Sequence, residues 1–193
     1  DISSNRVCGA LQAVDKKKIT VENRACAVYE DRERMVNALG EALAGLSVSE
    51  ISCGLSLTPE FFFFRSLTIP FTDHKQVRSV LQYELQDNVV LAEEDYLHET
   101  ILYESSSEMT GVLAVLIERE KLRSILNIFR SYSLDPQTVS VSGMAAITNF
   151  IRSGSGEKQS FKVVDISVRY AALYLIKNGT IQLVRSIPYD NRE

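Results

Sequence analysis

Apolar and polar residues alternate along much of the first seventy positions, a pattern typical of half-buried strands. Strands are therefore predicted at 7–14, 19–29, 51–57 and 60–69, with a polar turn at 15–18 that makes the first two a hairpin. Asp31 offers a helix N-cap, and apolar residues then recur at helical spacing as far as Ser47. This order of strands around one helix is typical of an α/β layer.

After Pro70 the pattern becomes helical, then alternating, then helical again. Thr72 is the expected N-cap of a helix that ends near Asn88, and a second helix ends before Pro136. Strands are predicted at 96–103 and 111–117, with a hairpin loop at 104–110. The run 111–117 is apolar throughout, so we expect it at the centre of a sheet. Together these elements predict a small α+β unit.

The last third of the sequence predicts a strand, a helix and a three-stranded region. A strand is expected at 138–141, a helix at 143–151, a buried strand at 161–166 and a hairpin at 170–176 and 180–187. Asn178-Gly179 between the last two strands favours a type I′ turn. The Ser-Gly run at 153–156 is the expected connector between domains.

Composition narrows the function classes. The chain of 193 residues is 45% hydrophobic and 24% charged, which is typical of a globular protein and excludes disorder. A net charge of −4 argues against a nucleic-acid partner, because phosphate binding requires a basic face. The longest apolar runs fall far short of the ~20 residues of a membrane helix, and we expect no signal peptide.

Cysteine and acidic residues give two further expectations. Cys8, Cys26 and Cys53 lack CxxC spacing, so we expect three reduced core thiols in a cytosolic protein and no metal site. Positions 73 to 108 contain nine acidic residues and only two basic ones. This stretch is either a solvated surface or a docking face for a basic partner. The candidate partner-binding residues are Glu93, Glu94, Asp95 and Tyr96.

A short internal repeat suggests a nucleotide site. Asp1-Ile2-Ser3-Ser4 and Asp165-Ile166-Ser167 each precede a hairpin, as do the two phosphate loops of the actin-like ATPase superfold. The candidate nucleotide-binding residues are Asp1, Ser3, Ser4, Asp165 and Ser167. The alternative interpretation is that both aspartates are ordinary turn residues. No catalytic residue is assigned, since no Walker, Ser-His-Asp or paired-carboxylate motif is present.

Ordered sequence segments resemble the cytoplasmic actin-like proteins of pilus and secretion machines, namely PilM of type IV pili and the cytoplasmic part of GspL of type II secretion. The segments are 67–73, 82–87, 95–96, 112–117, 134–136, 164–167 and 185–188. The resemblance implies a truncated α/β fold of the actin-like, ribonuclease-H-like class. It further implies subdomain 1A at 1–69 plus 137–152, an inserted α+β subdomain 1C at 70–136, and the start of subdomain 2A at 160–193.

The resemblance also implies a function. We expect a non-enzymatic scaffold at the inner face of the bacterial inner membrane that binds the assembly ATPase and the cytoplasmic tail of a membrane-anchored platform protein. ATP-binding members carry glycine where this chain has Ser3 and Ser167, so neither ATP nor magnesium is expected. The alternative is an ATP-binding, PilM-like protein whose site is completed by residues outside this chain. Self-association and the choice between the two machines are left open.

Overall fold

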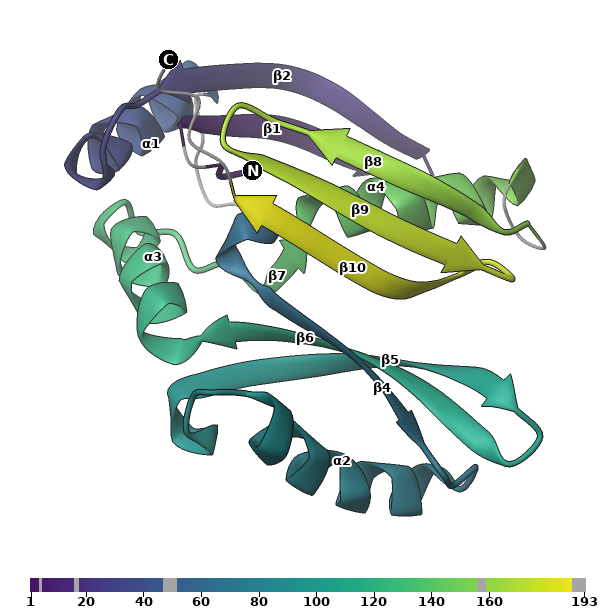
Figure 1. Ribbon diagram of the computed structural model, residues 1–193. Helices are drawn as coiled ribbons and strands as arrows, with labels where there is room; N and C mark the ends of the chain where they lie inside the picture. Colours follow the sequence, from purple (N-terminus) through teal and green to yellow (C-terminus); the bar gives the residue numbers. More distant parts are fainter. Residues whose placement is uncertain (4, 16–17, 47–51, 156–158, 189–193) are drawn as a thin grey trace. The chain divides into compact units, whose positions relative to one another are not determined.

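The computed structural model describes residues 1–3, 5–15, 18–46, 52–155 and 159–188. The chain divides into two compact units, and each has its own sheets (Figure 1). The first unit comprises Asp1–Thr58 and Ser124–Ser142, and the second comprises Pro59–Arg123 and Gly143–Glu193. The predicted division into three subdomains stays a prediction. Parts of several predictions lie outside the described residues, at Ser4, Lys16–Lys17, Ser47, Ile51 and Gly156.

The first unit contains two pairs of strands and a helix. The elements are β1 (Arg6–Asp15), β2 (Lys18–Val28), α1 (Arg32–Leu46), β3 (Gly54–Leu57) and β7 (Thr138–Val141). β1 and β2 form the predicted antiparallel hairpin, while β3 and β7 pair in parallel. The predicted cap of α1 is confirmed, because the Arg34 N–H donates to Asp31 Oδ1 at 2.9 Å.

The second unit opens with an antiparallel sheet covered by one helix (Figure 1). Its elements are β4 (Phe63–Ile69), α2 (His74–Asn88), β5 (Tyr96–Ser106) and β6 (Met109–Glu118). The sheet order is β4-β6-β5, so the apolar strand lies at the centre as predicted. Apolar side chains at helical spacing on α2 pack against β6. These side chains are Val77, Leu81 and Leu85.

The second unit ends with a helix and another antiparallel sheet. These elements are α4 (Ser142–Phe150), β8 (Phe161–Ile166), β9 (Tyr170–Lys177) and β10 (Thr180–Pro188), with sheet order β10-β9-β8. Asn178 and Gly179 both have positive φ, at 52° and 71°, so the predicted type I′ turn is confirmed. Helix α3 (Arg119–Ser131) begins in this unit and ends in the first.

Three local predictions are wrong, each for an identifiable reason. Asp73 rather than Thr72 caps α2, because its carboxylate accepts from the N–H groups of Lys75 and Gln76 at 3.0 Å. The hairpin loop expected at 104–110 is a tight turn, because β5 and β6 pair as far as Ser106 and Met109. The last error concerns β8, which is an edge strand and not a buried one.

The expectation of three reduced core thiols is also wrong. Cys8 and Cys26 form a disulfide across the β1–β2 hairpin, while Cys53 is free. The antiparallel register places the two cysteines directly opposite one another, with Cα atoms 4.1 Å apart. Neither lies in the core, since Cys26 is exposed and Cys8 is half-buried. Residue spacing alone did not reveal the pairing, because it depends on the strand register.

Candidate functional site

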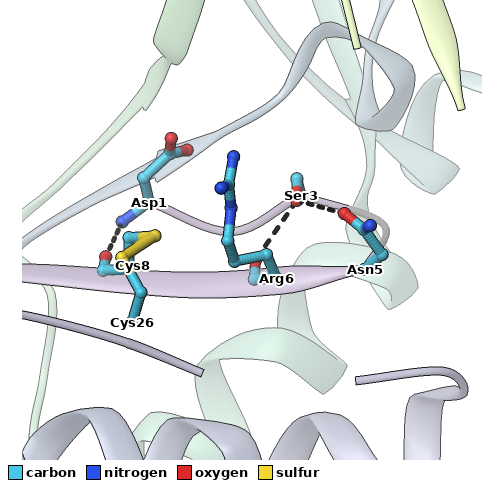
Figure 2. Close-up of a disulfide and its surroundings, with 6 residues drawn as sticks. All are labelled: Asp1, Ser3, Asn5, Arg6, Cys8 and Cys26. Atoms are coloured by element: carbon cyan, nitrogen blue, oxygen red, sulfur yellow. Dashed lines mark hydrogen bonds between the residues drawn. A yellow bond between two sulfur atoms is a disulfide. The ribbon is translucent and has the colours of Figure 1, made fainter. Parts of the chain in front are cut away.

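The first predicted loop is a closed turn between residues 1–3 and β1 (Figure 2). The Ser3 N–H donates to the Arg6 carbonyl at 3.0 Å. The Ser3 hydroxyl lies 3.3 Å from both Asn5 Oδ1 and the Arg6 carbonyl oxygen and donates within the turn. The Tyr29 hydroxyl donates to the Ser3 carbonyl. The polar groups of Ser3 are therefore engaged by this unit's own residues, and its side chain is buried.

Asp1 is attached to β1 through its backbone. Its amino group donates to the Cys8 carbonyl at 2.7 Å, and the Cys8 N–H donates to the Asp1 carbonyl at 2.9 Å (Figure 2). Burial lowers the pKa of this α-amino group below its usual value. The residue as a whole is exposed. Asp1 thus behaves as a strand residue paired with Cys8.

The second predicted loop, between β8 and β9, has the same backbone bond. The Ser167 N–H donates to the Tyr170 carbonyl at 2.9 Å, which repeats the Ser3–Arg6 bond three residues apart. The repeated Asp-Ile-Ser sequence therefore corresponds to two equivalent turns. Asp1 and Ser3 belong to the first unit and Asp165 and Ser167 to the second, while Ser4 lies outside the described residues.

The carboxylate of the second turn is engaged within its own hairpin. The Tyr170 hydroxyl donates to Asp165 Oδ2 at 2.9 Å. Burial, followed by this hydrogen bond to the carboxylate, raises the pKa of Tyr170 above its usual value. Burial likewise raises the pKa of Tyr174, which is fully buried on the same strand. One oxygen of the Asp165 carboxylate therefore already accepts a hydrogen bond from a side chain of the same hairpin.

The acidic segment forms a 3₁₀ turn over Glu93–Asp95 ahead of β5. Glu93 accepts from the side-chain amides of two glutamines on α2, Gln82 and Gln86. All three acidic residues are exposed, but Tyr96 is buried in the core beneath α2. Burial, with a contribution from the nearby Glu93 carboxylate, raises the pKa of Tyr96. The exposed part of the predicted partner surface is therefore acidic and lacks the tyrosine ring.

Arg119 fixes the path of this acidic turn. Its guanidinium donates to the carbonyls of Glu94 and Tyr96 at 2.8 and 3.3 Å. The side chains of Glu94 and Asp95 are thereby presented on a turn whose backbone is held in place. The roles of Arg119, Tyr29 and Tyr170 could not be predicted from sequence, since each acts through a contact distant in sequence or across a hairpin. The one sequence signal for Tyr170 is its position at the start of the strand that follows the turn after Asp165.

Across the described ranges, none of the helices has both the length and the apolar character needed to cross a membrane.

Comparisons with known proteins identify the fold. No protein-family model matches the sequence, and no curated protein matches it either. The solved structure of the PilM–PilN type IV pilus biogenesis complex matches 99% of this chain, with a TM-score of 0.82 and 14% identity. The cytoplasmic domain of EpsL, an inner membrane component of the type II secretion system of Vibrio cholerae, matches 97% of this chain with a TM-score of 0.64 and 13% identity.

This chain spans 61% of the PilM-complex chain and 68% of the EpsL chain. The two structures come from the two kinds of machine that the sequence resemblance named. The predicted class is therefore confirmed at the level of the fold: this chain has an actin-like α/β fold.

Proposed function

We propose that this chain is a non-enzymatic scaffold of a bacterial type IV pilus or type II secretion assembly platform. The observation that carries the proposal is the fold shared with the protein of the PilM–PilN complex over 99% of this chain. The similarity to EpsL, a component of the inner membrane, supports a position at the cytoplasmic face of that membrane. In this role the fold supplies docking surfaces for other proteins.

The proposed partners are the cytoplasmic tail of a membrane-anchored, PilN-like platform protein and the assembly ATPase. The acidic turn supports a contact with a basic segment of one of them, because Glu94 and Asp95 are exposed on a backbone that Arg119 fixes. Surface charges of this kind mainly accelerate association and make it salt-dependent. The same acidic residues would repel an acidic partner.

The non-enzymatic part of the proposal is supported by how the two turns use their polar groups. The Ser3 hydroxyl is bonded within its own turn, and the Asp165 carboxylate accepts from Tyr170. A glycine in each loop would let the backbone lie close to a phosphate. This chain has Ser3 and Ser167 at those positions, and each serine adds a Cβ. Both features oppose a nucleotide-binding role for Asp1, Ser3, Asp165 and Ser167.

An ATP-binding, PilM-like protein is the second candidate function. The observation that favours it is the identical backbone bond in the two turns, from Ser3 to Arg6 and from Ser167 to Tyr170. Since this chain spans 61% of the PilM-complex chain, such a site would draw on residues outside the present sequence. Nucleotide at 100 times its dissociation constant would stabilise the complete protein by about 2.7 kcal/mol.

Calorimetric titration of the complete protein tests the scaffold proposal. The ligands are a synthetic cytoplasmic tail of the PilN-like protein of the same organism and, separately, the purified assembly ATPase. We expect binding of at least one, weakened about tenfold or more by the double variant Glu94→Lys/Asp95→Lys, because reversed charges repel a basic partner. Glu41→Lys, on the exposed face of α1, is the matched control and should bind normally. Binding of neither ligand would rule the proposal out.

A further inference from the structure

Strand β5 lies at one edge of the β4-β6-β5 sheet in the second unit. It is 11 residues long and pairs along one side with β6. Its other side has no partner strand among the described residues. A long edge strand presents a row of unpaired backbone N–H and carbonyl groups, which a further strand can pair with.

A contact of Arg119 indicates which residues of β5 direct these groups outward. The Arg119 guanidinium donates to the Tyr96 carbonyl at 3.3 Å, so this carbonyl is turned away from β6. Alternate residues of an antiparallel strand direct their backbone groups to the same edge. The N–H and carbonyl groups of His98, Thr100 and Leu102 therefore point to the free edge of β5.

The side chains of β5 alternate between two faces of the sheet. Tyr96 and Leu102 pack in the core beneath α2, so the even-numbered residues of the strand face α2. Ile101 packs against the core of the β10-β9-β8 sheet, so the odd-numbered residues face that sheet. Leu97 shares the face of Ile101 and is 39% exposed. A strand added to β5 would have an apolar neighbour in Leu97.

A pocket of about 330 Å³ lies at the hairpin end of β5. Its lining includes Leu102 and Glu104 of β5, and Thr72 and His74 at the start of α2. A residue of an added strand opposite Leu102 or Glu104 would direct its side chain to the same face, because paired residues share a face. The pocket suits a lysine or arginine there, whose aliphatic stem contacts Leu102 while its charge lies near Glu104.

The charge of this region selects a basic strand as the occupant. Positions 93 to 108 contain six acidic residues and no lysine or arginine. Glu99 and Glu104 are exposed and form no ion pair within the part of the chain that the structure describes. Like charges opposite one another destabilise a pair of strands. A second copy of β5 carries the same carboxylates, so self-pairing at this edge is disfavoured as well.

We propose that β5 binds an extended basic segment of another protein as a fourth strand of the β4-β6-β5 sheet. Lysine or arginine at alternate positions of this segment points to the α2 face, where one of these side chains enters the pocket beside Glu104. Apolar residues at the intervening positions lie beside Leu97. Backbone hydrogen bonds to β5 provide affinity, and the alternating side chains provide specificity. The identity of the partner, the platform tail or the assembly ATPase, rests on the proposed function, but the binding mode does not.

Short peptides test the binding mode on this chain. The probe is acetyl-Arg-Val-Lys-Val-Lys-Val-Arg-amide, and its matched control carries glutamate at every basic position. Two further forms of the probe carry backbone N-methyl groups, either at the three valines or at the two lysines, so that one edge of the extended peptide loses N–H donors. Binding is followed by NMR titration. Hydrogen exchange is measured at the amides of His98, Thr100 and Leu102.

We expect the basic peptide at saturation to slow exchange of these three amides about tenfold or more, because they become hydrogen-bonded. The acidic peptide should leave exchange unchanged. Only one of the two methylated forms should lose binding, because a strand offers β5 one of its two edges. Absence of binding by the basic peptide, equal binding by the acidic one, or binding by both methylated forms would each overturn the proposal.

Two variants of the chain sharpen this test. Glu104→Lys should weaken binding of the basic peptide about tenfold, because it places a cation beside the pocket. Glu41→Lys, the same charge change on the exposed face of α1, is its matched control and should bind normally. Unchanged affinity in Glu104→Lys would overturn the proposed place of the basic side chain.

Thr100→Pro removes an outward N–H and spares the bonds between β5 and β6, as proline on an edge strand can. The variant should fold and lose the peptide, and normal binding by the folded variant would overturn the proposal. The methylated peptides carry this part of the test if Thr100→Pro does not fold.

The same exchange measurement with the platform ligands separates this inference from the proposed function. If the PilN-like tail or the assembly ATPase binds the complete protein without slowing these amides, β5 is not its docking edge, and the scaffold role stands. If neither ligand binds but the basic peptide does, the scaffold role fails and the binding mode stands.

Discussion

The two Asp-Ile-Ser turns start from the same three residues and end in different surroundings. Both close with a bond from the serine N–H to the carbonyl three residues on. Ile2 is nonetheless 1% exposed between two strands, whereas Ile166 is 73% exposed at the end of an edge strand. The local sequence thus determines the turn, and the position of the strand in its sheet determines how far its side chains are exposed.

The carboxylates differ in the same way. Asp165 accepts a hydrogen bond from Tyr170 within its hairpin, and the equivalent of Tyr170 in the first turn is Arg6. In the first turn Tyr29, the residue directly after β2, donates a hydrogen bond to the serine carbonyl instead. The two turns therefore share one backbone hydrogen bond, while their polar groups bond to different neighbours.

The largest expected effect comes from shortening the two isoleucines. Ile2→Ala should lower the free energy of unfolding by about 3 kcal/mol, because it leaves a cavity in a packed sheet. Ile166→Ala, its matched counterpart, should stay within about 0.5 kcal/mol of the parent chain. Urea unfolding followed by circular dichroism measures both. Equal losses for the two variants would contradict the different burial of the two turns.

The disulfide gives the next largest difference between the regions. The residue of the second hairpin that corresponds to Cys8 is Ala172, so only the first hairpin carries a cross-strand bond. Cys8→Ser/Cys26→Ser should lower the free energy of unfolding by about 2–3 kcal/mol, since the bond closes a loop of 18 residues in the unfolded chain. Hydrogen exchange should increase in β1 and β2 and remain unchanged in β8 to β10.

The same cysteines test the proposed location. Cytoplasmic thiols are kept reduced, so alkylation of intact cells followed by mass spectrometry should find Cys8 and Cys26 blocked as free thiols. The purified, air-oxidised protein should show them paired. Recovery of the bond from rapidly alkylated cells would place this domain in an oxidising compartment and contradict a cytoplasmic role.

Removing the tyrosine hydroxyls of β9 should have smaller and opposite effects. Tyr170→Phe should lower the free energy of unfolding by about 1–2 kcal/mol, because Asp165 loses a donor. Tyr174→Phe should leave stability unchanged or raise it, since the buried Tyr174 hydroxyl has no hydrogen-bond partner in the part of the chain that the structure describes. Thermal unfolding at neutral pH distinguishes them, and a larger loss for Tyr174→Phe would contradict these contacts.

The raised pKa values of these tyrosines predict a pH dependence. Above pH 10, the usual tyrosine value, the unfolded chain loses phenolic protons before the folded chain does. The free energy of unfolding should therefore fall as the pH rises above 10, and less steeply in the double variant Tyr170→Phe/Tyr174→Phe. Stability that is flat in alkali, or an unchanged slope in the variant, would argue against buried phenols in this sheet.

Periodic elements of this fold could be predicted from the sequence, and features set by neighbouring strands could not. Local sequence patterns were sufficient for three features of the fold. These are the turn at Asn178-Gly179, the apolar side chains at helical spacing on α2 and the apolar strand β6. The exposure of Ile166 and the pairing of Cys8 with Cys26 depend on sheet order and register, which no local pattern encodes. For the same reason the two turns were found from sequence but their side-chain partners were not.

The scaffold account is tested most directly by the thermal stability of the complete protein with two ligands in parallel. One sample contains the cytoplasmic tail of the PilN-like protein and the other contains magnesium and ATP, each at saturating concentration. The account predicts that the tail raises the melting temperature and that ATP leaves it unchanged, since only a ligand bound to the folded state stabilises it. Stabilisation by ATP without stabilisation by the tail would contradict the account.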